Sequence, residues 1–372
     1  MQSNRQRDTE QPDDQRYIKR RNNTEQKDPI LYVAENAQNV SINMNGVTNI
    51  VLETLHYMRR NYDNHNLDAV TYNYVRLSTE FHPKVNDPTA ADWLFVLNTL
   101  NYSLWTPKGQ QEWKVDGLTG YLALCAALKR AVDDGLPIWD SAFYKNISIN
   151  NMKHIFRGDN NTFIPRIFSK LRTLHRVGEV LVDKYKGTFK QCILSCNRNP
   201  MILGAILRDH FPSFYDMHTY DDETVPLNNK AWILVTDIWA FFPEEHELAI
   251  NIEIKKIPTI FVDYRVPQIL HHFNALVYSK NLLDKLEKSD KPLVHGSREE
   301  LEIRCCSLII LKYAHKLMMD KYSDQYTVYL PELELSNFDG MCLFDNFLWD
   351  YRQLFDEQLK KNPLFKIDTD QY

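Results

Sequence analysis

Long stretches of the chain place apolar residues three and four positions apart, a spacing that brings them to one face of a helix. This spacing predicts helices over residues 120–132, 168–185 and 269–288, and Pro267 precedes the last of them, as suits a first helical turn. In the first of these helices, the side chains predicted to face a core are Leu122, Cys125, Ala126 and Leu128. Helices are therefore expected to make up most of the chain.

A helix start signal precedes another long apolar run. Ser297 and Glu300 have the S-x-x-E spacing of a capping box ahead of residues 303–319. Strand signals are few, and the short β-branched runs are residues 259–262 and 327–330. We therefore predict a mainly α protein with few short strands, folded as a single compact domain.

The first 28 residues differ from the rest of the chain. They are rich in Gln, Asn, Arg and Asp, and Ile18 is their only aliphatic branched residue. Such a segment buries too little apolar surface to offset the entropy lost on ordering, so residues 1–28 are predicted to be a disordered tail. No apolar run follows a basic start, which argues against a secretory signal. The domain is predicted to span residues 29–372.

Composition and charge narrow the classes of partner. With 372 residues and a hydrophobic fraction of 44%, the chain can bury a sizeable core. Its formal net charge of −5 disfavours a stable grip on nucleic acid, which needs a basic surface to neutralise phosphates. No apolar run approaches the roughly 20 residues that span a bilayer. A small anionic ligand fits this composition, because one Lys or Arg is enough to bind it.

Cysteines and histidines show no metal-binding pattern. The six cysteines include no C-x-x-C pair, which indicates reduced, buried thiols in a cytoplasmic protein rather than a redox or metal pair at Cys192 and Cys196. The twelve histidines also lack ligand spacing, and His246 has no second histidine at the distance found in a zincin helix. We therefore expect core or surface histidines and no bound metal.

The first of four segments that mix aromatic and polar residues runs from residue 92 to residue 105. Near its end, Asn101, Tyr102 and Trp105 combine amide and aromatic groups, as suits a pocket that stacks a planar base and binds its edge. A core helix followed by a turn at Thr106 explains the same residues.

Two further segments each place charged side chains near the predicted core. Residues 230–239 predict a buried helix with Lys230 and Asp237 on roughly the same face, although a solvated lysine and a packed aspartate fit as well. In residues 261–268, Asp263 follows an apolar run and precedes a proline-initiated helix, at a corner where a carboxylate can face a cleft. Stabilisation by the dipole of that helix explains Asp263 equally well.

The fourth segment, residues 343–351, is predicted to be an apolar helix interrupted by Asp345 and Asp350. Burying a carboxylate is costly unless it is paired or hydrogen-bonded. The two aspartates therefore indicate either a polar ligand with N–H donors or a positive charge, or salt bridges to Arg or Lys elsewhere in the fold.

Taken together, these segments resemble the queuosine salvage protein family, the queuosine 5′-phosphate N-glycosidases, over roughly residues 30–372. The resemblance rests on Asp92-Trp93 with Asn101 to Trp105, Gly120-Tyr121 with the Cys-Ala-Ala run, Lys230 to Trp239, Asp263 to Gln268, Glu302 to Arg304 with Cys306-Ser307, Asp345 to Tyr351, and Tyr372. Family members release queuine, a 7-deazaguanine base, from queuosine 5′-monophosphate. The resemblance implies a helical fold similar to helix-hairpin-helix DNA glycosylases, and neither a cofactor nor a metal.

The resemblance also implies roles for particular residues. It places the catalytic aspartate at Asp263, a lysine of the site at Lys230, and carboxylates of the base pocket at Asp345 and Asp350. The remaining substrate-binding candidates are Phe261, Asn101, Tyr102, Trp105 and Asn346. Tyr102 stands where the family commonly has Phe, and Asn346 where it commonly has Tyr, so fine substrate contacts are expected to differ.

Cleavage of an N-glycosidic bond builds positive charge on the sugar, and a carboxylate about 3 Å away stabilises that charge or attacks the anomeric carbon. Asp263 is the expected carboxylate, while Lys230 either binds the 5′-phosphate or keeps Asp263 ionised and oriented. We thus expect a hydrolase that converts queuosine 5′-monophosphate to queuine and ribose 5-phosphate, and so supplies queuine for tRNA modification. A DNA or RNA glycosylase acting on a flipped base and a non-enzymatic helical interaction protein are the alternatives.

Overall fold

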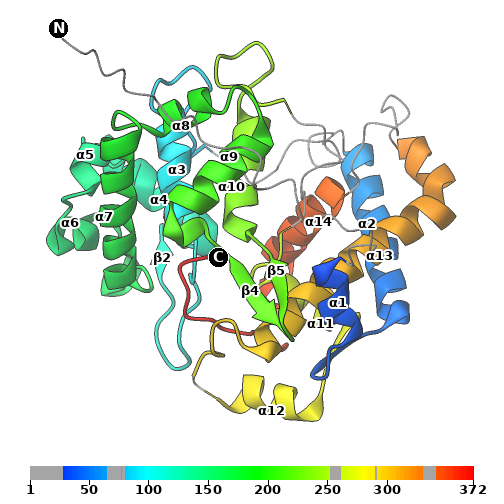
Figure 1. Cartoon of the computed structure of the whole chain (residues 1–372). Helices are drawn as coiled ribbons and strands as arrows, with labels where there is room; N and C mark the ends of the chain where they lie inside the picture. The colour runs from blue at the N-terminus through cyan, green and yellow to red at the C-terminus, as the bar shows by residue number, and fades with distance from the viewer. Residues whose placement is uncertain (1–27, 65–76, 78–79, 252–260, 290, 330–340) are drawn as a thin grey trace, which may run out of the picture.

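The computed structural model describes residues 28–64, 77, 80–251, 261–289, 291–329 and 341–372. Within these ranges the chain is mainly helical, and its strands form two-stranded antiparallel sheets (Figure 1). The predicted mainly α class with few short strands is therefore confirmed. In the part of the chain that is described, no helix is both long enough and apolar enough to cross a membrane. Apart from Asp28, the predicted tail lies outside the described residues.

One group of helices, on the left in Figure 1, surrounds a first apolar core. Its helices are α3 (Ala90–Leu100), α4 (Gly120–Asp133), α5 (Ser141–Tyr144), α6 (Ile149–Ile155), α7 (Ile167–Lys184), α8 (Phe189–Ser195), α9 (Pro200–His210) and α10 (Asn229–Phe241). Helix α3 is buried along its whole length, which is why its sequence is apolar on all sides rather than on one face. The helices predicted over residues 120–132, 168–185 and 230–239 are confirmed by α4, α7 and α10.

Short elements connect this group. They are β2 (Lys114–Val115), β3 (Leu118–Thr119), β4 (Met217–Tyr220), β5 (Glu223–Pro226) and the single-turn 3₁₀ helices η3 (Asp159–Asn161) and η4 (Pro212–Phe214). Strands β2 and β3 form a hairpin directly before α4, and β4 and β5 form another before α10. Each hairpin therefore delivers the chain to the first turn of a helix.

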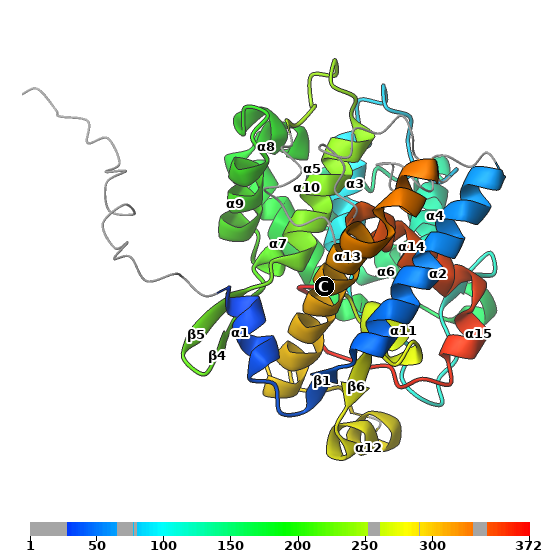
Figure 2. The same ribbon diagram turned by 90° about the vertical axis from the view of Figure 1, so that its right-hand side faces the viewer.

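A second group, on the right in Figure 1, encloses a separate core. Its elements are α1 (Pro29–Glu35), β1 (Val40–Ile42), α2 (Met44–Asp63), α11 (Val266–His272), β6 (Leu276–Tyr278), α12 (Lys280–Lys288), α13 (Arg298–Tyr329), α14 (Met341–Leu354) and α15 (Asp356–Leu359). Helices α2 and α13 lie side by side in both views (Figures 1 and 2). The capping signal is confirmed, because Ser297 Oγ accepts a hydrogen bond from the Glu300 backbone N at 3.4 Å as α13 begins.

The prediction of one continuous helix over residues 269–288 is wrong. Helix α11 ends at His272, and β6 and α12 follow it. Asn274 has a left-handed φ of 55°, and the next residues pair with β1, far away in sequence. Gly46 of α2 permits this path, since a Cβ there would lie 2.3 Å from the backbone of Asn274 and Ala275. A long-range strand pairing thus outweighs the local helical periodicity.

The two predicted strands are also not seen. Residues 327–329 belong to α13, while Leu330 lies outside the described residues. A helix that continues satisfies its backbone hydrogen bonds locally, whereas a strand needs a partner strand. Of residues 259–262, the first two lie outside the described part, and Phe261 and Val262 form no strand.

Candidate functional site

A cavity of about 140 Å³ lies where the two groups of helices meet. The C-terminal end of α3 and the first turns of α4 and α10 face α14 and the start of α11 across it. Of the predicted site residues, those that line the cavity are Asp263, Lys230, Phe261, Asp345, Asn101 and Tyr102. Four segments that are far apart in sequence therefore contribute to one site.

The structure places the other three predicted site residues away from this lining. Trp105 Nε1 donates a hydrogen bond to the Ile367 carbonyl oxygen at 3.1 Å. Asp350 accepts a hydrogen bond from Tyr57 Oη at 2.7 Å, which directs its side chain toward α2. Among the described residues its partner is thus a tyrosine rather than an Arg or Lys. Asn346 is buried outside the lining. Direct contact of these side chains with a ligand in the cavity finds no support in this geometry.

Asp263 lies at the turn before α11, and both sequence interpretations of it hold together. Its Oδ1 accepts hydrogen bonds from the backbone N of Arg265 at 2.7 Å and of Val266 at 3.1 Å, while the side chain lines the cavity. Burial raises the pKa of Asp263, and the two N–H groups oppose that shift, as do the Arg265 and Arg352 guanidiniums. The helix start therefore holds a partly desolvated carboxylate in one orientation.

Lys230 lies in the first turn of α10 and is almost completely buried. Its Nζ donates hydrogen bonds to the carbonyl oxygens of Asp370 at 2.5 Å and Thr99 at 3.3 Å, and lies 5.0 Å from the ring centre of Tyr102. Burial lowers the pKa of Lys230 to about 7, although the Asp370 and Asp216 carboxylates act in the opposite direction. The Lys230 amino group can therefore gain or lose a proton near neutral pH.

Two arginines that sequence reasoning did not single out line the same cavity, Arg265 and Arg352. Each has a nitrogen 3.7–3.8 Å from one shared carboxylate oxygen of Asp356, beyond ordinary hydrogen-bond distance. Arg352 also donates to Thr119 Oγ1 at 3.3 Å, but its buried Nε has no hydrogen-bond partner among the described residues. Burial and repulsion by Arg265 lower the pKa of Arg352. Two guanidiniums that share one carboxylate suit an anionic ligand.

The sequence did contain a partial signal for this pair. Arg265 stands in the D-Y-R-V-P-Q run that carries Asp263, and Arg352 directly follows the segment 343–351 that was predicted to be helical. A motif shows that a residue is near the site in sequence, but only packing shows that its side chain reaches the cavity.

Aromatic rings form much of the remaining wall. Tyr121 and Trp349 meet edge to face, with ring centres 5.4 Å apart, and Phe261, Tyr264 and Tyr372 line the same space. Polarised flat surfaces of this kind bind planar bases through stacking and edge contacts. The cavity thus combines a carboxylate, cationic groups and aromatic walls.

The C-terminal residues close one side of the cavity, and the C-terminus lies near the middle of the molecule in both views (Figures 1 and 2). Ser103 Oγ bonds the carbonyl oxygens of Ile367 at 3.0 Å and Thr369 at 2.9 Å, and Trp105 bonds the first of these. Trp105 therefore fastens the segment that brings Tyr372 into the cavity wall.

Comparison with known proteins shows the family of this chain. The family model described as queuosine salvage protein matches residues 81–372, a range that includes all cavity residues. The queuosine 5′-phosphate N-glycosylase/hydrolase of Bos taurus is 32% identical over 76% of this chain and 82% of its own length. The proteins of the same name from Mus musculus (32% over 77% and 83%) and Sphaerobacter thermophilus (33% over 62% and 70%) are similar too. The chain therefore belongs to the queuosine salvage protein family.

Proposed function

We propose that this protein is a hydrolase that cleaves the N-glycosidic bond of queuosine 5′-monophosphate, releasing queuine for tRNA modification and ribose 5-phosphate. The observation that carries this proposal is the Asp263 carboxylate, held by two backbone N–H groups in the wall of a cavity with aromatic faces and guanidiniums. The names of the similar proteins support the choice of substrate.

The proposed reaction follows from the charge that develops at the sugar. The base leaves with the electrons of the C–N bond, and positive charge grows on C1′ and on the ring oxygen. Asp263 stabilises this charge or attacks C1′, and water finally supplies OH to C1′ and a proton to the base. A 7-deazapurine has carbon at position 7, so the leaving base must be protonated or hydrogen-bonded at another atom. Asp345, which lines the cavity, is our candidate acceptor for the N–H groups of the base.

The cationic groups divide into two roles in this proposal. Lys230 Nζ already donates to two backbone carbonyls, whereas Arg352 Nε is buried without a partner among the described residues. We therefore assign the 5′-phosphate to Arg265 and Arg352, which can bind its oxygens through several N–H groups. Lys230 then keeps a positive charge in the cavity wall, while the Arg265 and Arg352 guanidiniums favour the ionised form of Asp263.

The phosphate assignment predicts a preference among substrates. Wild-type protein should show a higher kcat/KM for queuosine 5′-monophosphate than for queuosine, and Arg352→Gln should reduce that ratio. Loss of one charged hydrogen bond costs about 1.5–3 kcal/mol, so the ratio should fall roughly tenfold to a hundredfold. Chromatography of the released base measures both rates. Arg157→Gln, at an exposed arginine outside the cavity, serves as control. Equal kcat/KM for nucleotide and nucleoside in the wild type would refute phosphate recognition.

The shifted pKa values predict a bell-shaped dependence of kcat/KM on pH. Activity should rise as Asp263 ionises and fall above about pH 7, because Lys230 is charged below its pKa of about 7 and neutral above it. In Lys230→Met the alkaline decline should vanish, with lower activity at all pH values. Initial rates between about pH 5 and pH 9 test this. An alkaline limb that persists unchanged in Lys230→Met would assign that limb to another group.

The cysteines whose side chains are described, Cys125, Cys192, Cys196, Cys305 and Cys306, are free thiols, which fits a reducing compartment such as the cytoplasm. A small nucleotide, rather than a nucleic acid or a membrane, is the proposed partner. We propose residues 29–372 as the catalytic domain, preceded by a tail that takes no part in catalysis.

A further inference from the structure

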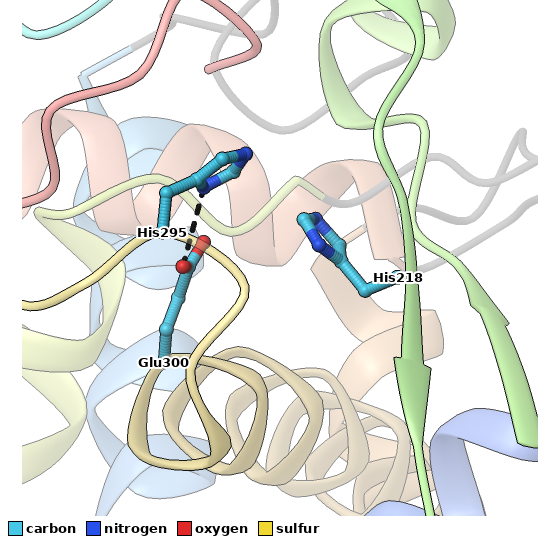
Figure 3. A group of neighbouring side chains, drawn as sticks. All are labelled: His218, His295 and Glu300. Carbon is cyan, nitrogen blue, oxygen red and sulfur yellow. Dashed lines mark ion pairs between the residues drawn. The ribbon is translucent and has the colours of Figure 1, made fainter. Parts of the chain in front are cut away.

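Outside the cavity lining, three side chains with metal-binding atoms converge on one point (Figure 3). His218 comes from β4, His295 from the loop before α13, and Glu300 from the first turn of α13. One potential ligand atom of each lies within 4.8 Å of the other two. Because β4 and α13 are far apart in sequence, no motif spacing could reveal this group.

The hydrogen bonds of His218 direct its second ring nitrogen toward the centre of the group. Its Nε2 lies 2.8 Å from Asp216 Oδ1. The Arg304 guanidinium donates hydrogen bonds to both Asp216 oxygens, at 3.0 Å and 2.5 Å, so Asp216 is placed as an acceptor and His218 Nε2 as the donor. The lone pair of a neutral ring is then on Nδ1. A Cβ on Gly296, the neighbour of His295, would lie 3.3 Å from this Nδ1. The Asp216 carboxylate bonds one nitrogen of the His218 ring and leaves the other, Nδ1, open. Metal-binding histidines usually have this arrangement, with a carboxylate on one ring nitrogen and the metal on the other.

His295 shows the same division between its two nitrogens. Its Nε2 lies 2.9 Å from Gln371 Oε1 and 3.3 Å from Thr369 Oγ1. Its Nδ1 lies 3.3 Å from a Glu300 carboxylate oxygen and makes no hydrogen bond of acceptable geometry to any described residue. If Nε2 donates to Gln371, two atoms with lone pairs, Nδ1 and Oε2, face one another. A proton on Nδ1, or a metal ion that both atoms bind from one side, removes that repulsion.

The surroundings hold Glu300 in place and leave a net negative charge. One Glu300 oxygen accepts a hydrogen bond from Gly296 N at 2.6 Å, and the other accepts one from Tyr372 Oη at 2.6 Å. With neutral imidazoles, the charges of Asp216, Glu300 and Arg304 sum to −1. The carboxylate is thus already oriented, and the site favours a cation.

We propose that His218, His295 and Glu300 bind one divalent transition-metal ion of the zinc class, with water as a further ligand. Two imidazole nitrogens and one carboxylate oxygen are a donor set that suits Zn²⁺. The ion supplies no step of the proposed reaction. It braces the cavity instead, because Glu300 accepts a hydrogen bond from Tyr372, which is one of the residues of the cavity wall. This inference revises the sequence-based expectation of no bound metal and is independent of the proposed substrate.

Titration of the chelator-treated, full-length protein with Zn²⁺ against a chromophoric competitor tests the site. We expect one equivalent to bind at micromolar or lower concentration and to raise the melting temperature. Co²⁺ in its place should give visible absorption bands of a low-coordinate site. His218→Ala and His295→Ala should each weaken binding at least tenfold. His56→Ala removes a surface histidine paired with a single glutamate, at 3.6 Å, and should bind Zn²⁺ like the wild type.

Two outcomes would overturn the proposal. One is wild-type protein that does not bind Zn²⁺ in the micromolar range, which would mean that a proton on His295 is the only cation in the group. The other is unchanged Zn²⁺ affinity in both variants. If either alanine variant fails to fold, His218→Asn and His295→Gln keep a polar side chain at each position and are tested in the same titration.

Discussion

Replacing Asp263 with asparagine is expected to lower kcat on queuosine 5′-monophosphate by roughly 10²–10³-fold while the fold is retained. The amide oxygen of Asn can accept the same two hydrogen bonds from Arg265 N and Val266 N, and Asn forms such turns as Asp does. What the variant loses is the negative charge that offsets the positive charge on the sugar. The melting temperature should therefore change little, although kcat falls strongly.

A matched control separates charge from backbone capping. Asp159 also accepts two backbone N–H bonds, from Asp116 at 3.2 Å and Gly117 at 2.9 Å, but it lies outside the cavity lining. Asp159→Asn should keep wild-type activity. Chromatographic assay of free base and thermal melts on both variants give the comparison. A well-folded Asp263→Asn with normal kcat would remove this residue from the mechanism.

The second large effect is expected at Arg304, where methionine should destabilise the protein by roughly 3–5 kcal/mol. Arg304 is almost fully buried, bonds both oxygens of Asp216, and lies 3.8 Å from the ring centre of Tyr372. Without it, the Asp216 and Glu300 carboxylates stay buried without their guanidinium partner. Since domains are stable by only about 5–15 kcal/mol, the loss is a large fraction of the total.

Urea unfolding measures this loss, and pH provides an internal check. Arg304 lowers the pKa of Asp216 in the folded state, so the native protein binds that proton more weakly than the unfolded chain does. The ion pair therefore stabilises the fold at neutral pH, and its contribution declines as pH falls below about 4. The difference between wild type and Arg304→Met should shrink at low pH. Arg157→Met, at an exposed ion pair, should cost at most about 1 kcal/mol. Equal losses for the two variants would contradict the role given to burial.

The sequence by itself determined the features that depend on neighbouring residues. Helices α4, α7, α10 and α14 follow from apolar spacing, because a helix satisfies its own backbone hydrogen bonds and needs only one face to be buried. The position of Asp263 in the turn before a helix follows from Pro267 and the preceding apolar run, since an aspartate that bonds backbone N–H groups two and three residues on is a local interaction. The family resemblance then singled out Lys230 and Asp345, and both line the cavity.

Only the tertiary structure decided which side chains meet. Asp345 and Asp350 stand on one apolar helix, yet packing turns the first toward the cavity and the second toward Tyr57. Spacing along a helix shows relative directions, but it does not show what lies in each direction. For the same reason the sequence did not show that Arg265, in the turn before α11, and Arg352, in α14, meet at the cavity.

Long-range pairing decided the rest. Within residues 269–288, which have a helical pattern, β6 forms a strand because it pairs with β1. His218 meets His295 and Glu300 only because β4 packs near the start of α13. A local pattern reflects the energies of nearby residues, whereas these contacts gain their free energy from segments brought together by burial of the cores. The chain's sequence therefore indicated its class and several residues of its site, and the packing of two cores determined the cavity and the histidine group.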